Sequence, residues 1–118
     1  MAMATAGLSR PLAGRRLVPL WAIVHHVGRR SGTSYSTPVA IIRIHDGFLI
    51  PVPFGPSTQW PRNVLAAGGC RIRWQGRDYA TVDPEIINWA TAKPMAPPRF
   101  GYIIPITGID TFLRLREA

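Results

Sequence analysis

Two tight turns divide much of this chain into short segments of apolar and β-branched residues. Asp46-Gly47 separates residues 36–45 from residues 48–52, and both segments are mostly apolar. A second turn at residues 75–78 joins two segments in which apolar and polar side chains alternate. Asp-Gly between such segments is a strong hairpin signal, and alternation is typical of a half-buried strand. Short strands joined by hairpins leave bare edges unless the sheet closes, so the pattern predicts a small antiparallel β-barrel.

The same signals predict the other elements. We expect strands over residues 18–27, 70–74 and 79–82, a short mid-chain helix over 60–67, a short helix over 85–92, and a strand or helix over 109–115. Pro51 and Pro53 cannot donate to a β-ladder, so they are expected to place the end of the third strand at an edge or a bulge. The predicted class is therefore mainly β within α+β, with one short mid-chain helix and short flanking helices.

The length of 118 residues corresponds to one domain. We assign residues 1–16 to a basic N-terminal arm and residues 17–118 to a single domain. The only cysteine is Cys70, which excludes an intrachain disulfide and a cysteine zinc site and favours a reducing, cytoplasmic location. No stretch of about 20 apolar residues and no signal peptide is evident.

The charge is strongly positive. Lys and Arg number 14 against 6 for Asp and Glu, which gives a formal net charge of +8. Such an excess indicates an anionic partner: a nucleic acid, a phosphate-bearing cofactor or an acidic membrane surface, which the basic arm would touch at the inner face of the cell membrane. The competing interpretation is a genome that prefers arginine codons.

Several classes of enzyme site are absent from the sequence. It has no Gly-x-Ser-x-Gly, His-Glu-x-x-His or Cys-x-x-Cys motif. The adjacent His25 and His26 would point to opposite faces of a strand, so they cannot chelate one metal together. One of them is expected to lie against the core and the other in solvent, and no metal site is predicted.

Two polar segments are the candidates for a binding site. The turn from Gly28 to Gly32 can offer backbone N–H groups to an anion, with Arg29 and Arg30 as cations and Ser31 as a hydroxyl. The alternative is a solvated basic turn. At the start of the predicted mid-chain helix, Trp60 can wall a flat ring and Asn63 can bond its polar edge. Core packing is the alternative for Trp60.

Together these segments resemble a known family. The ordered set is Gly28-Arg-Arg-Ser-Gly32, then Tyr35-Ser-Thr-Pro-Val39, then Asp46-Gly47, then Trp60-x-x-Asn63-Val-Leu-Ala-Ala-Gly-Gly-Cys70. It is similar to the deazaflavin-dependent nitroreductase family, actinobacterial split β-barrel proteins that use coenzyme F420, and in particular to the quinone-reductase-like branch. The resemblance implies a split β-barrel. It spans residues 28–84 and extends to segments at 10–15 and 108–115.

The resemblance also implies roles for particular residues. In the family the basic turn holds the phosphate and oligoglutamate tail of the cofactor, which here falls to Arg29, Arg30 and Ser31. The residues implied along the ring are Tyr35, Ser36, Thr37, Pro38, Val39, Ala40, Val52, Pro53, Phe54, Gly55, Gln59, Trp60, Pro61, Arg62 and Asn63. Tyr102 is the candidate proton donor, with solvent as the other source.

The chain departs from the family pattern at two places. Arg30 stands where lysine is frequent, which keeps the charge. Pro51, Pro53 and Phe54 stand where small residues are usual, so two backbone donors are missing beside the ring and bulk is added.

The implied activity is hydride transfer from reduced deazaflavin to a small-molecule acceptor: a quinone, a nitroaromatic compound or an activated alkene. Three alternatives stay open at this point. The first is a carrier that binds coenzyme F420 without turnover, and the second is a split-barrel protein that binds FMN or haem. The third and least favoured is a nucleic-acid-binding module, whose surface would consist of Arg71, Arg73 and Arg77 beside Trp74 and Tyr79. The protein could be a monomer or a homodimer.

Overall fold

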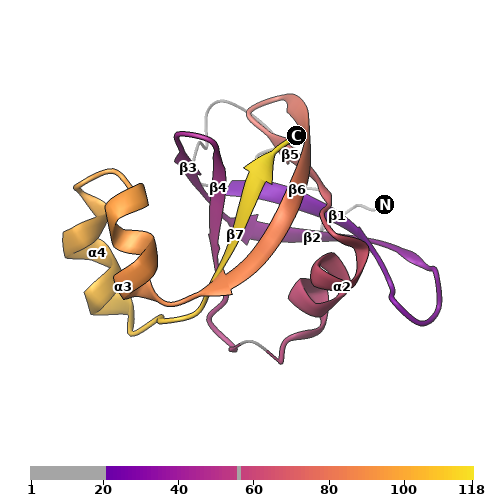
Figure 1. Ribbon diagram of the computed structural model, residues 1–118, viewed down its shortest axis with the longest axis horizontal. Coiled ribbons are helices and arrows are strands. Elements are labelled where there is room, and N and C mark those ends of the chain that lie inside the picture. The colour runs from indigo at the N-terminus through magenta and orange to yellow at the C-terminus, as the bar shows by residue number, and fades with distance from the viewer. Residues whose placement is uncertain (1–20, 56) are drawn as a thin grey trace.

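The computed structural model describes residues 21–55 and 57–118. Seven strands form a continuous antiparallel sheet in the order β2-β1-β5-β6-β7-β4-β3, which curls into a half-barrel (Figure 1). The strands are β1 (Trp21–Val27), β2 (Ser34–Ala40), β3 (Ile42–Ile44), β4 (Gly47–Pro51), β5 (Arg71–Trp74), β6 (Arg77–Ile87) and β7 (Phe112–Glu117). The helices are α2 (Gln59–Ala67), α3 (Trp89–Ala92) and α4 (Phe100–Thr107), with a 3₁₀ turn at Lys93–Met95. The prediction of a small, mainly β split barrel is confirmed.

The long strand β6 joins the two halves of the sheet. Its first part pairs with β5 and its second part with β7, and the register shifts between Val82 and Glu85. Asp83 at this bulge has a φ of 54°, and the following Pro84 needs no ladder partner there. The bulge lets one strand turn from one half of the barrel into the other.

Strand β4 is buried on both faces because two core clusters lie on either side of it. Phe48 and Ile50 pack into the interior of the barrel with α2, whereas Leu49 packs into a second cluster with Phe100 and Ile104 of α4. Successive side chains of a strand point to opposite faces, so a continuous apolar segment is what such a position requires.

The helix predicted over residues 85–92 is wrong for its first part, and only residues 89–92 are helical. Residues 85–87 continue β6, and α3 begins only after Asn88, whose side chain accepts a hydrogen bond from the Thr91 N–H (2.9 Å). The strand continues because Glu85, Ile86 and Ile87 pair with β7, a partner that lies far along the chain. A local pattern cannot reveal that pairing.

The strand predicted over residues 36–45 is two strands. Its first part pairs with β1 and its second with β4, and Ile41 between them is 1% exposed. The break occurs where the chain passes from one half of the barrel to the other.

The hairpins and α2 agree with the sequence analysis. Gln75 and Gly76 both have positive φ (50° and 77°), as a two-residue type I′ turn requires. Gly47 is needed for a different reason: a Cβ there would lie 1.9 Å from the Leu115 carbonyl oxygen of β7. Pro51 ends β4 beyond its last pair with β3, Ile42 with Leu49, so the proline removes no ladder donor on that side.

Two expectations concern parts outside the described residues. The N-terminal arm at 1–16, with its expected membrane contact, lies outside them, as does the start of the strand predicted over 18–27. Within residues 21–55 and 57–118, no helix has the length and apolar character needed to cross a membrane.

Candidate functional site

The turn between β1 and β2 is closed by its own hydrogen bonds. The Gly28 N–H donates to the Thr33 carbonyl (2.8 Å), and the Gly32 N–H donates to the Gly28 carbonyl (2.9 Å). The Thr33 N–H donates to Ser31 Oγ (3.1 Å). The expectation that the backbone of this turn forms an anion nest is therefore only partly met, because these N–H groups already have acceptors. The capacity to bind an anion lies mainly with the side chains.

Arg29 is held against α2 by neutral acceptors. Its backbone N–H and its guanidinium both donate to Asn63 Oδ1, at 3.2 and 2.8 Å, and the guanidinium also donates to Gln59 Oε1 at 2.9 Å. These bonds fix the guanidinium without neutralising it. Partial desolvation, followed by the charges of Arg62 and Arg30, lowers the pKa of Arg29.

Arg29, Arg30 and Arg62, here called the turn arginines, form no ion pair in the described part of the chain. The sequence contains six acidic residues, and all of them contact other groups. Five pair with arginines of the strands, and Asp110 accepts a hydrogen bond from the Trp89 N–H. A cluster of like charges without carboxylates attracts an anionic ligand.

His26 connects the turn arginines to β2. The ring is 8% exposed, stacks on Tyr35 at 5.5 Å, and forms hydrogen bonds through both nitrogens. Nε2 lies 2.9 Å from Thr37 Oγ1, and Nδ1 lies 3.2 Å from Asn63 Nδ2. Burial, and to a smaller extent the charge of His25, lowers the pKa of His26, so the ring is neutral at pH 7. The expectation of one buried and one solvated histidine is confirmed in that His26 is buried and His25 is partly exposed.

Two of the turn arginines, Arg29 and Arg30, line a hollow of about 400 Å³, here called the arginine hollow. Its lining residues are Gly28, Arg29, Arg30, Ser31, Tyr35, Gln59 and Asn63. Six of these seven residues belong to the two polar segments that the sequence singled out, so the fold brings these segments together.

A second hollow of about 520 Å³, here called the apolar hollow, is lined mainly by hydrophobic side chains. Its lining residues are Trp21, Thr37, Pro38, Val39, Ala40, Ile41, Ile42, Pro51, Pro53, Phe54, Thr58, Trp60, Phe100, Ile103, Ile104, Thr107 and Ile109. Trp60 also packs against the barrel core, as its alternative interpretation expects.

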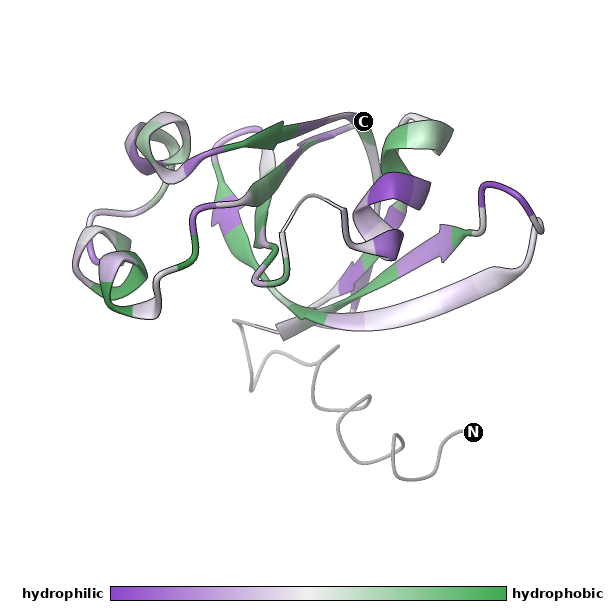
Figure 2. Ribbon diagram, turned by 90° about the horizontal axis from the view of Figure 1, so that it is seen from below, coloured by the Kyte–Doolittle hydropathy of each residue, from purple (hydrophilic) through white to green (hydrophobic). Residues whose placement is uncertain are grey.

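The two hollows are neighbours because the same elements contribute to both. In α2, Gln59 lines the arginine hollow and Trp60 lines the apolar hollow. In β2, Tyr35 lines the arginine hollow and Thr37 lines the apolar hollow. These two residues lie on one face of the strand, because alternate residues of a strand share a face. Figure 2 shows hydrophilic residues at the β1–β2 turn and apolar residues on α4 at the other end.

Some predicted site residues line neither hollow. Ser36 bonds His25 Nδ1 instead (3.0 Å), and Val52 and Pro61 are fully buried in the fold. Gly55 and Arg62 are not among the lining residues, although Arg62 acts on Arg29 through its charge.

Tyr102, the predicted proton donor, is 81% exposed and lines a separate hollow with Lys93 and Pro94. Phe54 is 86% exposed, so its ring forms part of the rim of the apolar hollow and does not fill it.

His26 was not predicted to be part of the site, and neither was α4 predicted to line the apolar hollow. His26 could have been found by continuing the hairpin register from the turn, which places it opposite Tyr35. No comparable signal exists for Phe100, Ile103 and Ile104, because they reach the apolar hollow only through the packing of α4 on the sheet.

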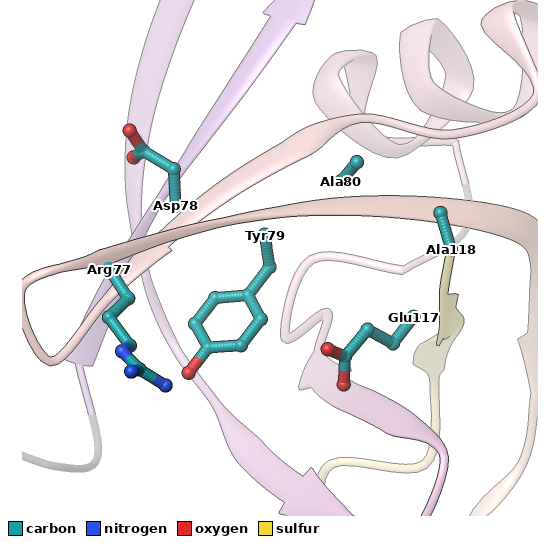
Figure 3. Close-up of a pocket in the computed structure, with 6 residues that line it drawn as sticks. All are labelled: Arg77, Asp78, Tyr79, Ala80, Glu117 and Ala118. Atoms are coloured by element: carbon teal, nitrogen blue, oxygen red, sulfur yellow. The ribbon is translucent and has the colours of Figure 1, made fainter.

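The surface considered for nucleic-acid binding lies on the β5–β6 hairpin, apart from the arginine and apolar hollows. Figure 3 shows Arg77, Tyr79 and Glu117 around a fourth hollow on one side of β6, with Asp78 on the other side. Trp74 and Tyr79 meet Phe48 edge-on at 5.7 and 5.3 Å, and the guanidinium of Arg43 lies over the Tyr79 ring. Both rings are partly buried against the barrel core.

Comparisons with known proteins place this geometry in context. No family model and no curated protein matches the chain. Among solved structures, an F420-H2 dependent reductase, FDR-A, matches with a TM-score of 0.53 at 14% identity, over 80% of this chain and 93% of that chain. A domain-swapped dimer also matches with a TM-score of 0.53 at 14% identity, over 93% of this chain and 95% of that chain. At this identity, the likeness shows a shared fold.

Proposed function

We propose that this protein is a coenzyme F420-dependent oxidoreductase of the deazaflavin-dependent nitroreductase family. The observation that carries the proposal is the group of turn arginines, which have no carboxylate partner among the described residues; two of them line a hollow beside the apolar hollow that Trp60 lines. An elongated ligand with an anionic tail and a flat ring matches both hollows. The F420-H2 dependent reductase among the similar structures supports this assignment.

The residues at the two hollows fit the two parts of the cofactor. Arg29 and Arg30 would hold the phosphate and the acidic tail, with Ser31 as a hydroxyl donor. Trp60 and the β2 residues from Thr37 to Ala40 would lie along the deazaflavin ring. When bound, the reduced deazaflavin supplies a hydride to an electron-poor acceptor. The protein's part is to position the two reactants and exclude water, which the apolar lining favours.

We propose a quinone, a nitroaromatic compound or an activated alkene as the acceptor. The walls that α4 and the end of β4 contribute are hydrophobic, and a flat, weakly polar acceptor suits them. Of the two proton sources, the placement of Tyr102 in another hollow favours solvent. Pro51 and Pro53 have no N–H to donate to the deazaflavin ring. The N–H of Val52, between them, already donates to the Thr111 carbonyl (2.8 Å).

A carrier that binds the cofactor without turnover is the second candidate function. It is favoured by the position of Tyr102, which is 81% exposed and is not among the residues that line the apolar hollow. The domain-swapped dimer among the similar structures supports a homodimeric assembly for either candidate.

The test is equilibrium binding of coenzyme F420, FMN and haem to the purified chain, side by side. We expect saturable binding of coenzyme F420 alone, and preferential binding of FMN or haem would contradict the proposal. Oxidation of reduced deazaflavin in the presence of menadione then separates the enzyme from the carrier, because the carrier would show none.

A further inference from the structure

Three threonines line the apolar hollow, and two of them have their hydroxyl hydrogens engaged. Thr58 Oγ1 donates to the Gly55 carbonyl (2.8 Å), and Thr107 Oγ1 donates to the Ile104 carbonyl (2.6 Å). Thr37 differs, because among the described residues its hydroxyl has a single hydrogen bond, to His26. Whether Thr37 donates to or accepts from a ligand therefore depends on which nitrogen of His26 carries the proton.

Arg29 determines, through Asn63, which nitrogen of His26 carries the proton. Arg29 presents only donors, and two of them reach Asn63 Oδ1, so the amide must turn its oxygen toward Arg29 and its NH₂ toward His26. Asn63 Nδ2 then donates to His26 Nδ1 (3.2 Å), which must be unprotonated. In a neutral ring the proton is consequently on Nε2, and Nε2 donates to Thr37 Oγ1.

We propose that Thr37 is a hydrogen-bond donor to a ligand in the apolar hollow, and that Arg29 sets this polarity through Asn63 and His26. The ligand must then present an acceptor at Thr37, such as a carbonyl oxygen or an unprotonated ring nitrogen, and an anion at Arg29. Thr37 is a specificity-determining residue in this scheme, whereas His26 and Asn63 are positioning residues. The inference deepens the proposed function and rests on it for the identity of the ligand.

The prolines of the β4–α2 segment make this donor more important. Pro51 and Pro53 have no N–H, and the N–H groups of Val52 and Gly55 donate to the Thr111 and Val52 carbonyls. In the part of this segment that the structure describes, few backbone donors are left to meet a polar ring edge. The Thr37 hydroxyl, on β2, would compensate for the missing donors.

The first test reads the proton directly, without a ligand. Long-range ¹H–¹⁵N spectra of the full-length protein at pH 7.5 are expected to show His26 protonated at Nε2 and unprotonated at Nδ1. Asn63→Asp replaces the amide donor by an acceptor, so His26 Nδ1 is expected to gain a proton. Asn88→Asp makes the same chemical change at the cap of α3 and is expected to leave the His26 signals unchanged. A proton on Nδ1 in the wild type would overturn the inference, even if Asn63→Asp does not fold.

The second test measures binding of coenzyme F420 by fluorescence titration. Thr37→Val keeps the shape and removes the hydroxyl, and we expect affinity to fall about tenfold. Thr37→Ser keeps the donor and is expected to bind within about twofold of the wild type. Equal affinity for Thr37→Val and the wild type would contradict the inference and leave the proposed function intact. If the wild type itself does not bind coenzyme F420, the proposed function fails, and the nitrogen spectra still decide the polarity of the relay.

Discussion

Two groups of three arginines in this protein have opposite surroundings. Among the turn arginines, Arg29 donates to two neutral acceptors on α2, Asn63 and Gln59, and none of the three forms an ion pair with the residues that the structure describes. The strand arginines, by contrast, contact carboxylates: Arg43 with Glu117 at 2.6 Å, Arg114 with Asp46 at 3.0 Å, and Arg116 with Asp83 at 3.5 Å. The residue type is the same, but of these two groups only the strand arginines are paired with carboxylates; Arg73, which belongs to neither group, pairs with Asp78. The comparison indicates that the strand arginines stabilise the barrel, whereas the turn arginines are available to a ligand.

The largest effect is expected from removing the charges at the turn. The double substitution Arg29→Ala and Arg30→Ala deletes two charge-assisted contacts, so affinity for coenzyme F420 is expected to fall by roughly 100-fold or more, with a weaker dependence on salt. Fluorescence titration at two ionic strengths measures both quantities. Arg73→Ala is the matched control, because Arg73 pairs with the exposed Asp78 on β5–β6. Unchanged affinity in the double variant would show that the turn does not hold the anionic tail.

A smaller effect is expected when Arg29 receives the carboxylate that the strand arginines have. Gln59→Glu converts the 2.9 Å hydrogen bond from Arg29 into an ion pair at the start of α2. We expect affinity to fall roughly tenfold, since the new carboxylate competes with the ligand and repels it. Stability is expected to stay level or rise, because an acidic residue is favourable at a helix N-terminus. Tighter binding of coenzyme F420 by Gln59→Glu would contradict the view that Arg29 binds the ligand because it has no carboxylate partner.

The reciprocal change affects folding and leaves binding intact. Arg114 is largely buried and contacts both Asp46 and Glu85, so Arg114→Ala is expected to lower the free energy of unfolding by about 1–2 kcal/mol. Urea denaturation measures the loss, and the fluorescence titration is expected to give the affinity of the wild type. A large loss of affinity without a loss of stability would show that Arg114 serves ligand binding, contrary to its assignment to the strand arginines.

The mildest prediction concerns pH. His26 has its pKa lowered by burial and by His25, and it also faces Arg29 through Asn63 and the ring of Tyr35. The unfolded chain protonates this histidine near its ordinary pKa of 6.5, whereas the folded protein does so only at lower pH. The unfolded state therefore binds more protons, and the free energy of unfolding is expected to fall as the pH drops below about 6.5.

Urea denaturation between pH 7.5 and 5.5 tests this dependence. His26→Gln has no titrating ring and is expected to show a flatter profile than the wild type. His25→Gln is the matched control, because His25 is the more exposed of the pair, and it should retain most of the slope. Identical slopes in wild type and His26→Gln would exclude His26 as the origin.

The sequence predicted the elements that depend on local chemistry. The turn at Gln75-Gly76, the hairpin at Asp46-Gly47 and α2 with its glycine end are all confirmed, because each is specified by a few adjacent residues. It failed for β6, whose continuation past the bulge depends on pairing with β7. It also missed the relay through His26, because the hydrogen bonds of that ring come from two other elements.

By itself, the sequence determined where this chain turns, which segments alternate between core and solvent, and that its cations outnumber its carboxylates. Only the tertiary structure decided which cations are neutralised. Turn chemistry and side-chain alternation act between neighbours along the chain. The pairing of β4 and β6 with β7, by contrast, brings Asp46, Glu85 and Glu117 to the strand arginines and leaves none for Arg29. Electrostatic interactions depend on distance in space, and the fold sets that distance.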